Sequence, residues 1–168
     1  MKRKLGFIFI LLLLFVAVRI WIFQMYYIPG DVMSPTIEPG DRVLVFKPIY
    51  KFRNPHRGEI VIFKDPRQGK RSYGRRCVAI GGDTIEMREG LVHINGSVLH
   101  EPYLFPAPPD TIDWPPEVDV WNNWGPYTVS PRSIFVMGDN RGAATDFDSR
   151  FDGMLDVRHV IGKVIHSF

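Results

Sequence analysis

The chain begins with a long apolar stretch and then changes to short segments of alternating character. Leu5–Val18 is an uninterrupted apolar run, and Ile20–Phe23 continues it beyond Arg19. At about 1.5 Å per residue, a helix over Leu5–Phe23 would be roughly 28 Å long, close to the thickness of the hydrocarbon core of a bilayer. The pattern therefore predicts one N-terminal transmembrane helix.

The residues on either side of this run indicate its orientation. Lys2, Arg3 and Lys4 precede it, so the positive-inside rule places the N-terminus in the cytoplasm. A cleaved signal peptide is the alternative, but the bulky residues Gln24–Tyr27 offer no small-x-small cleavage site. We therefore predict an uncleaved anchor over residues 1–27, which crosses the cell membrane once, and an extracytoplasmic domain over residues 28–168.

From residue 42 onwards the sequence alternates between polar and apolar residues in short segments separated by turn signals. The Asn95-Gly96 pair is a strong signal for a two-residue hairpin. Short strands at this spacing predict an all-β domain, built as an antiparallel barrel or sandwich. The predicted strands are Arg42–Phe46, Glu59–Phe63, Arg76–Ile80, Thr84–Met87, Leu91–Ile94, Ser97–Leu99, Ser133–Met137 and His159–Ile165.

Residues 28–41 join the anchor to the first predicted strand. Pro29, Pro35 and Pro39 cannot donate backbone hydrogen bonds, so the stretch is expected to be extended and edge-like rather than helical. Such a segment just outside a membrane could pair with another extended peptide.

Residues 101–131 are unusually rich in proline and tryptophan, including Trp114, Trp121 and Trp124. The stretch is too aromatic for a flexible linker, so we predict an irregular excursion packed on the β-domain. Its tryptophans could form a small satellite core or contact lipid headgroups, and the sequence leaves both roles open.

Composition and charge exclude several function classes. The net charge of +3 comes partly from Lys2–Lys4, and the only other dense basic cluster, Arg71, Arg75 and Arg76, lacks interleaved aromatic residues, so nucleic-acid binding is not expected. The single cysteine, Cys77, excludes an intrachain disulfide and supplies no metal-binding or redox pair. We expect Cys77 to be a small buried side chain, and we expect no metal or cofactor.

The stretch Ile28–Ile37 reads Ile-Pro-Gly-Asp-Val-Met-Ser-Pro-Thr-Ile and is followed by Gly40 and Asp41. It resembles the nucleophile motif of the type I signal peptidases, Ile-Pro-Ser-Gly-Ser-Met-x-Pro-Thr-Leu, followed by Gly-Asp. Val32 stands in the place of the nucleophilic serine, and a valine side chain has no atom that can attack a carbonyl.

Tyr73–Asp83 resembles the general-base motif of the same family, Tyr-x-Lys-Arg-x-x-Gly-x-Pro-Gly-Asp, without a gap. Arg75 stands where the family has its lysine. A desolvated lysine can become a neutral general base, whereas a guanidinium, with a pKa above about 12, does not deprotonate in proteins. Lys70 is a poor substitute because it lies in a glycine-rich turn that we expect to be solvated.

A third match resembles the family pattern Gly-Asp-Asn-Arg-x-x-Ser-x-Asp-Ser-Arg, with two extra residues between its halves. The slot of the inner serine, which orients the lysine in the family, falls on Ala144 or Asp146, with Thr145 between them. The resemblance implies a structural ion pair between Asp148 and Arg76. The matching residues are Gly138, Asp139, Asn140, Arg141, Asp148, Ser149 and Arg150.

Asn95-Gly96 and Glu101–Leu104 also match the family, so the resemblance covers nearly the whole chain. It identifies the chain as a member of the type I signal peptidase family with degenerate catalytic residues. It implies a signal-peptidase-type β-domain and, as the family reaction, endoproteolytic removal of signal peptides from exported proteins. The substrate-binding residues that it implies are Asp31, Met33, Ser34, Pro35, Tyr73, Arg76 and Val78.

Because both residues of the Ser/Lys dyad are replaced, we expect the protein to be proteolytically inactive. It would instead bind extended segments of exported proteins, or secretion and surface-assembly partners, at the membrane. One alternative is an active peptidase that uses Ser34, which would face the same side of a strand as Val32, about 6.5–7 Å away. None of the five histidines lies in a motif with Ser34, so a Ser-His-Asp triad has no support. A second alternative is an anchored structural β-domain with no peptide groove.

Overall fold

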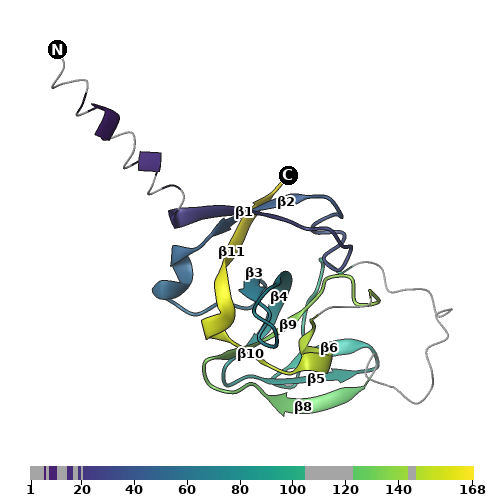
Figure 1. Cartoon of the computed structure of the whole chain (residues 1–168). Helices are drawn as coiled ribbons and strands as arrows, with labels where there is room; N and C mark the ends of the chain where they lie inside the picture. The colour runs from purple at the N-terminus through teal and green to yellow at the C-terminus, as the bar shows by residue number, and fades with distance from the viewer. Residues whose placement is uncertain are drawn as a thin grey trace.

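The computed structural model describes residues 6, 8–10, 15–16, 19, 21–104, 123–143 and 147–168. Two antiparallel sheets make up most of this part of the chain (Figure 1). The larger sheet has the strand order β1 (Phe23–Tyr27), β2 (Arg42–Phe46), β11 (Val160–Ser167), β3 (Ile60–Lys64), β4 (Ser72–Ile80), β9 (Ser133–Met137) and β10 (Leu155–Asp156). The smaller has the order β7 (Ser97–Val98), β6 (Leu91–Ile94), β5 (Thr84–Arg88) and β8 (Trp124–Thr128).

After β1, the structure also describes three short helical turns: η1 (Pro48–Lys51), α2 (Ser149–Asp152) and η3 (Val157–His159). The prediction of an all-β antiparallel domain is therefore confirmed. His159, expected in a strand, lies in η3, whereas His93 and His166 lie in β6 and β11.

Strand β4 lies between β3 and β9 in the larger sheet, and its residues 74–79 are all buried. Successive side chains of a strand point to opposite faces. Cys77 accordingly packs with Val61 and Val136 on one face, and Val78 packs with Ile85 on the other. Strand β4 is thus held on both faces, and it carries most of the general-base motif, Tyr73–Asp83.

The predicted hairpin is confirmed. Ile94 of β6 pairs with Ser97 of β7, and the two residues between them, Asn95 and Gly96, have φ angles of 52° and 81°. Positive φ at both central positions is what the favoured two-residue hairpin turn requires.

The excursion predicted over residues 101–131 is not wholly irregular. Strand β8 lies within it and pairs with β5, with Thr128 opposite Thr84. Residues 105–122, including Trp114 and Trp121, lie outside the described residues.

The sheet begins earlier than the predicted domain boundary between residues 27 and 28. Strand β1, residues 23–27, was assigned to the anchor but pairs with β2 along its whole length, from Phe23 opposite Phe46 to Tyr27 opposite Arg42. The described residues before it are helical. Within the part of the chain that the structure describes, there is no helix with the length and apolar character needed to cross a membrane.

The stretch after β1 is a compact series of turns, so the prediction of an extended, edge-like conformation was wrong. The Ser34 N–H donates to the Asp31 carbonyl at 2.9 Å, and the Ile37 N–H donates to the Met33 carbonyl at 2.9 Å. Burial explains this geometry, because Met33 and Ile37 both reach the core beside Val43. The prolines prevent a regular helix but are compatible with turns.

Candidate functional site

The turn that carries Val32 lies directly against the third motif. The Asn140 N–H donates to the Val32 carbonyl oxygen at 2.9 Å. A Cβ atom on Gly138 would lie 2.5 Å from Cγ1 and 2.6 Å from the carbonyl oxygen of Val32. Any larger residue at this position would force Val32 to shift, so the first and third motifs are in close contact here.

Arg75, at the general-base position, is almost completely buried. Its Nε donates to the Phe147 carbonyl oxygen at 2.7 Å, and its Nη1 donates to the Gly74 carbonyl oxygen at 2.7 Å. The Phe147 ring packs against Phe63, with 5.1 Å between centroids, and against Tyr73, with 6.5 Å. The arginine therefore acts as a fixed hydrogen-bond donor that joins the second motif to the third.

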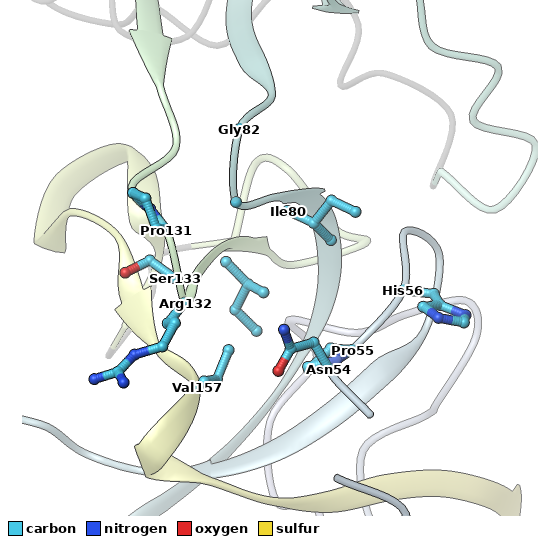
Figure 2. Close-up of a pocket in the computed structure, with 11 residues that line it drawn as sticks. Asn54, Pro55, His56, Ile80, Gly82, Pro131, Arg132, Ser133 and Val157 are labelled. Carbon is cyan, nitrogen blue, oxygen red and sulfur yellow. The ribbon is translucent and has the colours of Figure 1, made fainter. Parts of the chain in front are cut away.

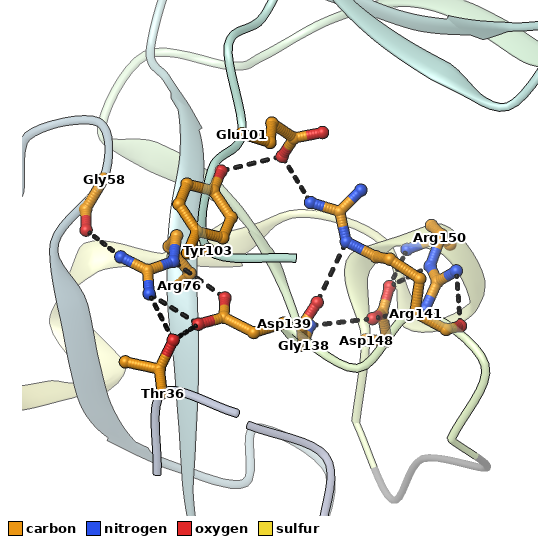
Figure 3. A network of polar contacts seen from close by, with 10 residues as sticks. All are labelled: Thr36, Gly58, Arg76, Glu101, Tyr103, Gly138, Asp139, Arg141, Asp148 and Arg150. Carbon is orange, nitrogen blue, oxygen red and sulfur yellow. Dashed lines mark hydrogen bonds and ion pairs between the residues drawn. The ribbon is translucent and has the colours of Figure 1, made fainter. Parts of the chain in front are cut away.

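The other arginine of the second motif, Arg76, forms a bidentate ion pair with Asp139 (Figure 3). Nε lies 2.7 Å from Oδ1 and Nη2 lies 2.5 Å from Oδ2. The Thr36 hydroxyl also donates to Asp139 Oδ2, at 2.5 Å, and Arg76 Nη1 donates to the Gly58 carbonyl oxygen at 2.7 Å. This pair links residues of all three motifs in a buried setting.

The predicted pair between Asp148 and Arg76 was therefore wrong. Asp148 pairs instead with Arg150, with Nε 2.9 Å from Oδ1 and Nη2 2.9 Å from Oδ2, and it caps the N-terminus of α2. The strand register explains the exchange of partners. Arg76 lies opposite Met137 of β9, and Asp139 follows Met137 by two residues, on the same face as Arg76.

A second layer of polar contacts lies over the Arg76 pair, and it comes from the Glu101–Leu104 match. The Tyr103 hydroxyl donates to Glu101 Oε1 at 2.7 Å, and Glu101 also forms an ion pair with Arg141. Arg141 Nε in turn donates to the Gly138 carbonyl oxygen at 2.9 Å. Sequence reasoning used these residues only as a family match, and nothing in their spacing predicted that they would support the loop beside Val32.

The predicted substrate-binding residues differ in their exposure. Met33 and Val78 are each only 1% exposed and belong to the hydrophobic core, whereas Asp31 and Pro35 are exposed and Tyr73 is half-buried. Contact of any of them with a substrate stays a prediction.

The proposed substitute nucleophile, Ser34, is 5% exposed, and its hydroxyl donates to Glu38 Oε2 at 3.1 Å. Because the turn replaces the expected strand, the i, i+2 relationship that would have placed Ser34 beside Val32 on one face does not apply.

The one cysteine of the chain, Cys77, is buried. Burial, followed by the nearby Glu59 and Asp83 carboxylates, raises the pKa of Cys77 to about 12, so the thiol stays protonated at neutral pH. No group of three or more histidine, cysteine, aspartate or glutamate side chains in the described ranges could hold a metal ion. Lys70 is exposed, as predicted.

A pocket of about 480 Å³ lies apart from Val32, Ser34 and Arg75, none of which lines it (Figure 2). Its walls come from residues 54–56, 80–82 and 131–134, with Val157. Figure 2 shows the Arg132 guanidinium directed away from Asn54, so the polar groups of the rim do not converge on one point.

The chain is similar in sequence to known signal peptidases. A family model described as "Signal peptidase, peptidase S26" matches residues 1–168. The chain is similar to signal peptidase I of Leptolyngbya laminosa, with 32% identity over 90% of this chain and 71% of the relative. It is also similar to the probable signal peptidase I-1 of a Synechocystis strain, with 32% identity over 99% of this chain and 82% of the relative.

The chain is also similar to a solved structure of a signal peptidase I. The crystal structure of a signal peptidase I from Enterococcus faecalis is similar to the model with a TM-score of 0.53 and 28% identity, over 67% of this chain and 98% of that one.

Proposed function

The chain belongs to the signal peptidase, peptidase S26, family, and from that premise we propose that it is a membrane-anchored homologue without proteolytic activity. The family removes signal peptides from exported proteins. This member would keep the capacity to bind such segments, and would act as an accessory in secretion or surface assembly.

The observation that carries the proposal is the contrast between the two dyad positions and their surroundings. The Val32 side chain has no nucleophilic atom, and the Arg75 guanidinium does not deprotonate in proteins, which supports the loss of both roles. Val32 packs against Gly138, and Arg75 donates hydrogen bonds to two carbonyl oxygens. The neighbouring Arg76–Asp139 pair is complete and buried. Removing a nucleophile or its base typically costs several powers of ten in rate.

The binding role rests on the retained backbone around the dyad positions. Extended peptides bind by adding a strand to an exposed sheet edge, where main-chain hydrogen bonds supply the affinity. Residues 28–36 and 73–80 are the segments expected to contact such a peptide. Of β4, only residues 72–75 have an edge without a strand partner among the described residues, so strand addition would take place there. The cell-membrane location, with a single pass, a cytoplasmic N-terminus and an extracytoplasmic domain, is part of this proposal and follows from the apolar run and Lys2–Lys4.

The proposal is tested with the purified full-length protein in detergent micelles. We expect no mature product from a signal-peptide precursor, and we expect a signal-peptide analogue to protect backbone amides in residues 28–36 and 73–80 from hydrogen exchange. Cleavage that disappears in Ser34→Ala would overturn the proposal in favour of a repositioned nucleophile. Absence of protection would favour an anchored structural domain instead.

No observation favours the Ser34 alternative over the inactive homologue. The hydroxyl is buried and bonded to Glu38, and a nucleophile displaced from the dyad position by even about 1 Å can lose a hundredfold in rate.

A further inference from the structure

Among the strands that the structure describes, only β3 pairs with the first part of β4. Residues 72–76 pair with β3, from Ser72 opposite Lys64 to Arg76 opposite Ile60. Pairing with β9 starts at Arg76 and continues to Ile80. Within the described residues, no strand lies along the second edge of residues 72–75.

The hydrogen bonds show which backbone groups face this open edge. The Cys77 N–H donates to the Glu59 carbonyl oxygen at 2.8 Å, and the Arg71 carbonyl accepts from the Asp65 N–H at 2.9 Å, so both residues face β3. Backbone groups of alternate residues in an antiparallel strand point to the same neighbour. Odd-numbered residues from 71 to 77 therefore face β3, and the N–H and carbonyl of Gly74 face the open edge.

The Arg75 side chain occupies this edge. Its Nη1 donates to the Gly74 carbonyl oxygen and its Nε donates to the Phe147 carbonyl oxygen, each at 2.7 Å. An incoming extended chain would need the Gly74 carbonyl as its acceptor. The guanidinium supplies, from within the molecule, a hydrogen bond that a bound peptide would otherwise make.

We propose that Arg75 is an intramolecular cap on the open edge of β4, which competes with an extended segment of an exported polypeptide for the Gly74 carbonyl. The inference rests on the proposed function and adds a regulatory contact to it. A lysine at this position has no Nε donor in a planar fork, so it cannot bridge the two carbonyl oxygens in the same way. The replacement that removes the general base thus also weakens binding of extended chains.

The test measures the dissociation constant of a fluorescent signal-peptide analogue for the full-length protein in detergent micelles. Arg75→Gln is expected to bind about tenfold more tightly than the wild type, as expected for removal of one competing hydrogen bond from a charged donor. Arg75→Lys, which keeps the positive charge, is expected to show a gain in the same direction. Arg71→Gln, which removes an exposed charge just before β4, is the matched control and should leave the constant unchanged.

A second analogue, with alternate backbone nitrogens methylated, distinguishes edge pairing from charge effects. The Arg75 variants should bind this methylated analogue no more tightly than the wild type does, because strand addition depends on main-chain donors. Thermal unfolding establishes that each variant is folded, and Arg75→Lys carries the test if Arg75→Gln does not fold.

Three results would overturn the cap. In the first, the folded Arg75 variants bind the analogue no more tightly than the wild type. In the second, Arg75→Gln and Arg71→Gln both bind more tightly but Arg75→Lys does not, which would indicate simple charge repulsion. Absence of binding by the wild type and by every variant would remove the proposed function together with the cap.

Discussion

The Tyr103 ring covers the Arg76 guanidinium, with 3.8 Å between the ring centroid and Cζ (Figure 3). A cation over an aromatic face contributes about 0.5–2 kcal/mol, depending on how far it is desolvated. Tyr103→Leu, which removes the ring and the hydroxyl, should therefore lower the free energy of unfolding more than Tyr103→Phe, which removes only the bond to Glu101. Chemical denaturation followed by tryptophan fluorescence measures both, and equal losses would contradict a role for the ring face.

Removing one partner of the Arg76–Asp139 ion pair should lower the free energy of unfolding strongly. Asp139→Ala would leave a buried guanidinium without its carboxylate, which typically costs about 3–5 kcal/mol. The pair between Arg158 and Asp156 supplies the control, because the Arg158 side chain is 74% exposed, so Arg158→Ala should lower the free energy of unfolding much less than Asp139→Ala. Similar losses for the two variants in urea denaturation would show that the buried pair has no special structural role.

A substitution at Gly138 should cause a steric clash with Val32, where the first and third motifs meet. An alanine Cβ would lie 2.5 Å from Val32 Cγ1, so Gly138→Ala should destabilise the fold by about 1–3 kcal/mol, as overpacking does. Gly30→Ala is the matched control, since a Cβ at Gly30 meets nothing within 4 Å. A melting temperature for Gly138→Ala equal to that of Gly30→Ala would contradict the described contact.

The stability of the protein should depend on pH through the carboxylate of Glu59. Burial alone would raise its pKa, but hydrogen bonds from Arg53, the His56 N–H and Lys163 outweigh burial and lower the pKa to about 2. A depressed carboxylate pKa contributes stability that is fully present above the unfolded value of 4.5 and is lost as the pH falls towards 2.

Glu59→Gln should therefore be less stable than the wild type at neutral pH, by about 2 kcal/mol, since the hydrogen bonds lost involve charged groups. The difference should narrow as the pH falls from about 4.5 to about 2. Thermal unfolding across this range measures it, and a constant difference would assign the effect to packing rather than to charge.

Much of the fold could be predicted from local patterns. The limits of β2, β6 and β9 agree with their alternating segments, and the hairpin follows from Asn95-Gly96 because that pair accepts positive φ. Strand β1 was missed because it follows the apolar run directly, sharing Phe23 with it, so its residues were assigned to the anchor. Strand β10 has only two residues, too few for any periodicity.

The resemblance to the family motifs named Val32 and Arg75 as the dyad positions, and that assignment stays a prediction. The contacts around these residues could not be predicted from the motifs. Local sequence could not decide whether Arg76 pairs with Asp139 or Asp148, because both aspartates belong to one motif and the choice depends on the register between β4 and β9. The turn at Ser34 was missed for a similar reason, since core burial outweighs the local preference of prolines for extended backbone.

The most direct test of the account restores the serine and the lysine of the dyad in this chain. Purified full-length wild type and the double variant Val32→Ser, Arg75→Lys are incubated with the same signal-peptide precursor, and mature product is measured over time. We predict no product from the wild type and clear processing by the double variant. Processing by the wild type at a rate comparable to that of the double variant would contradict the claim that Val32 and Arg75 abolish proteolysis.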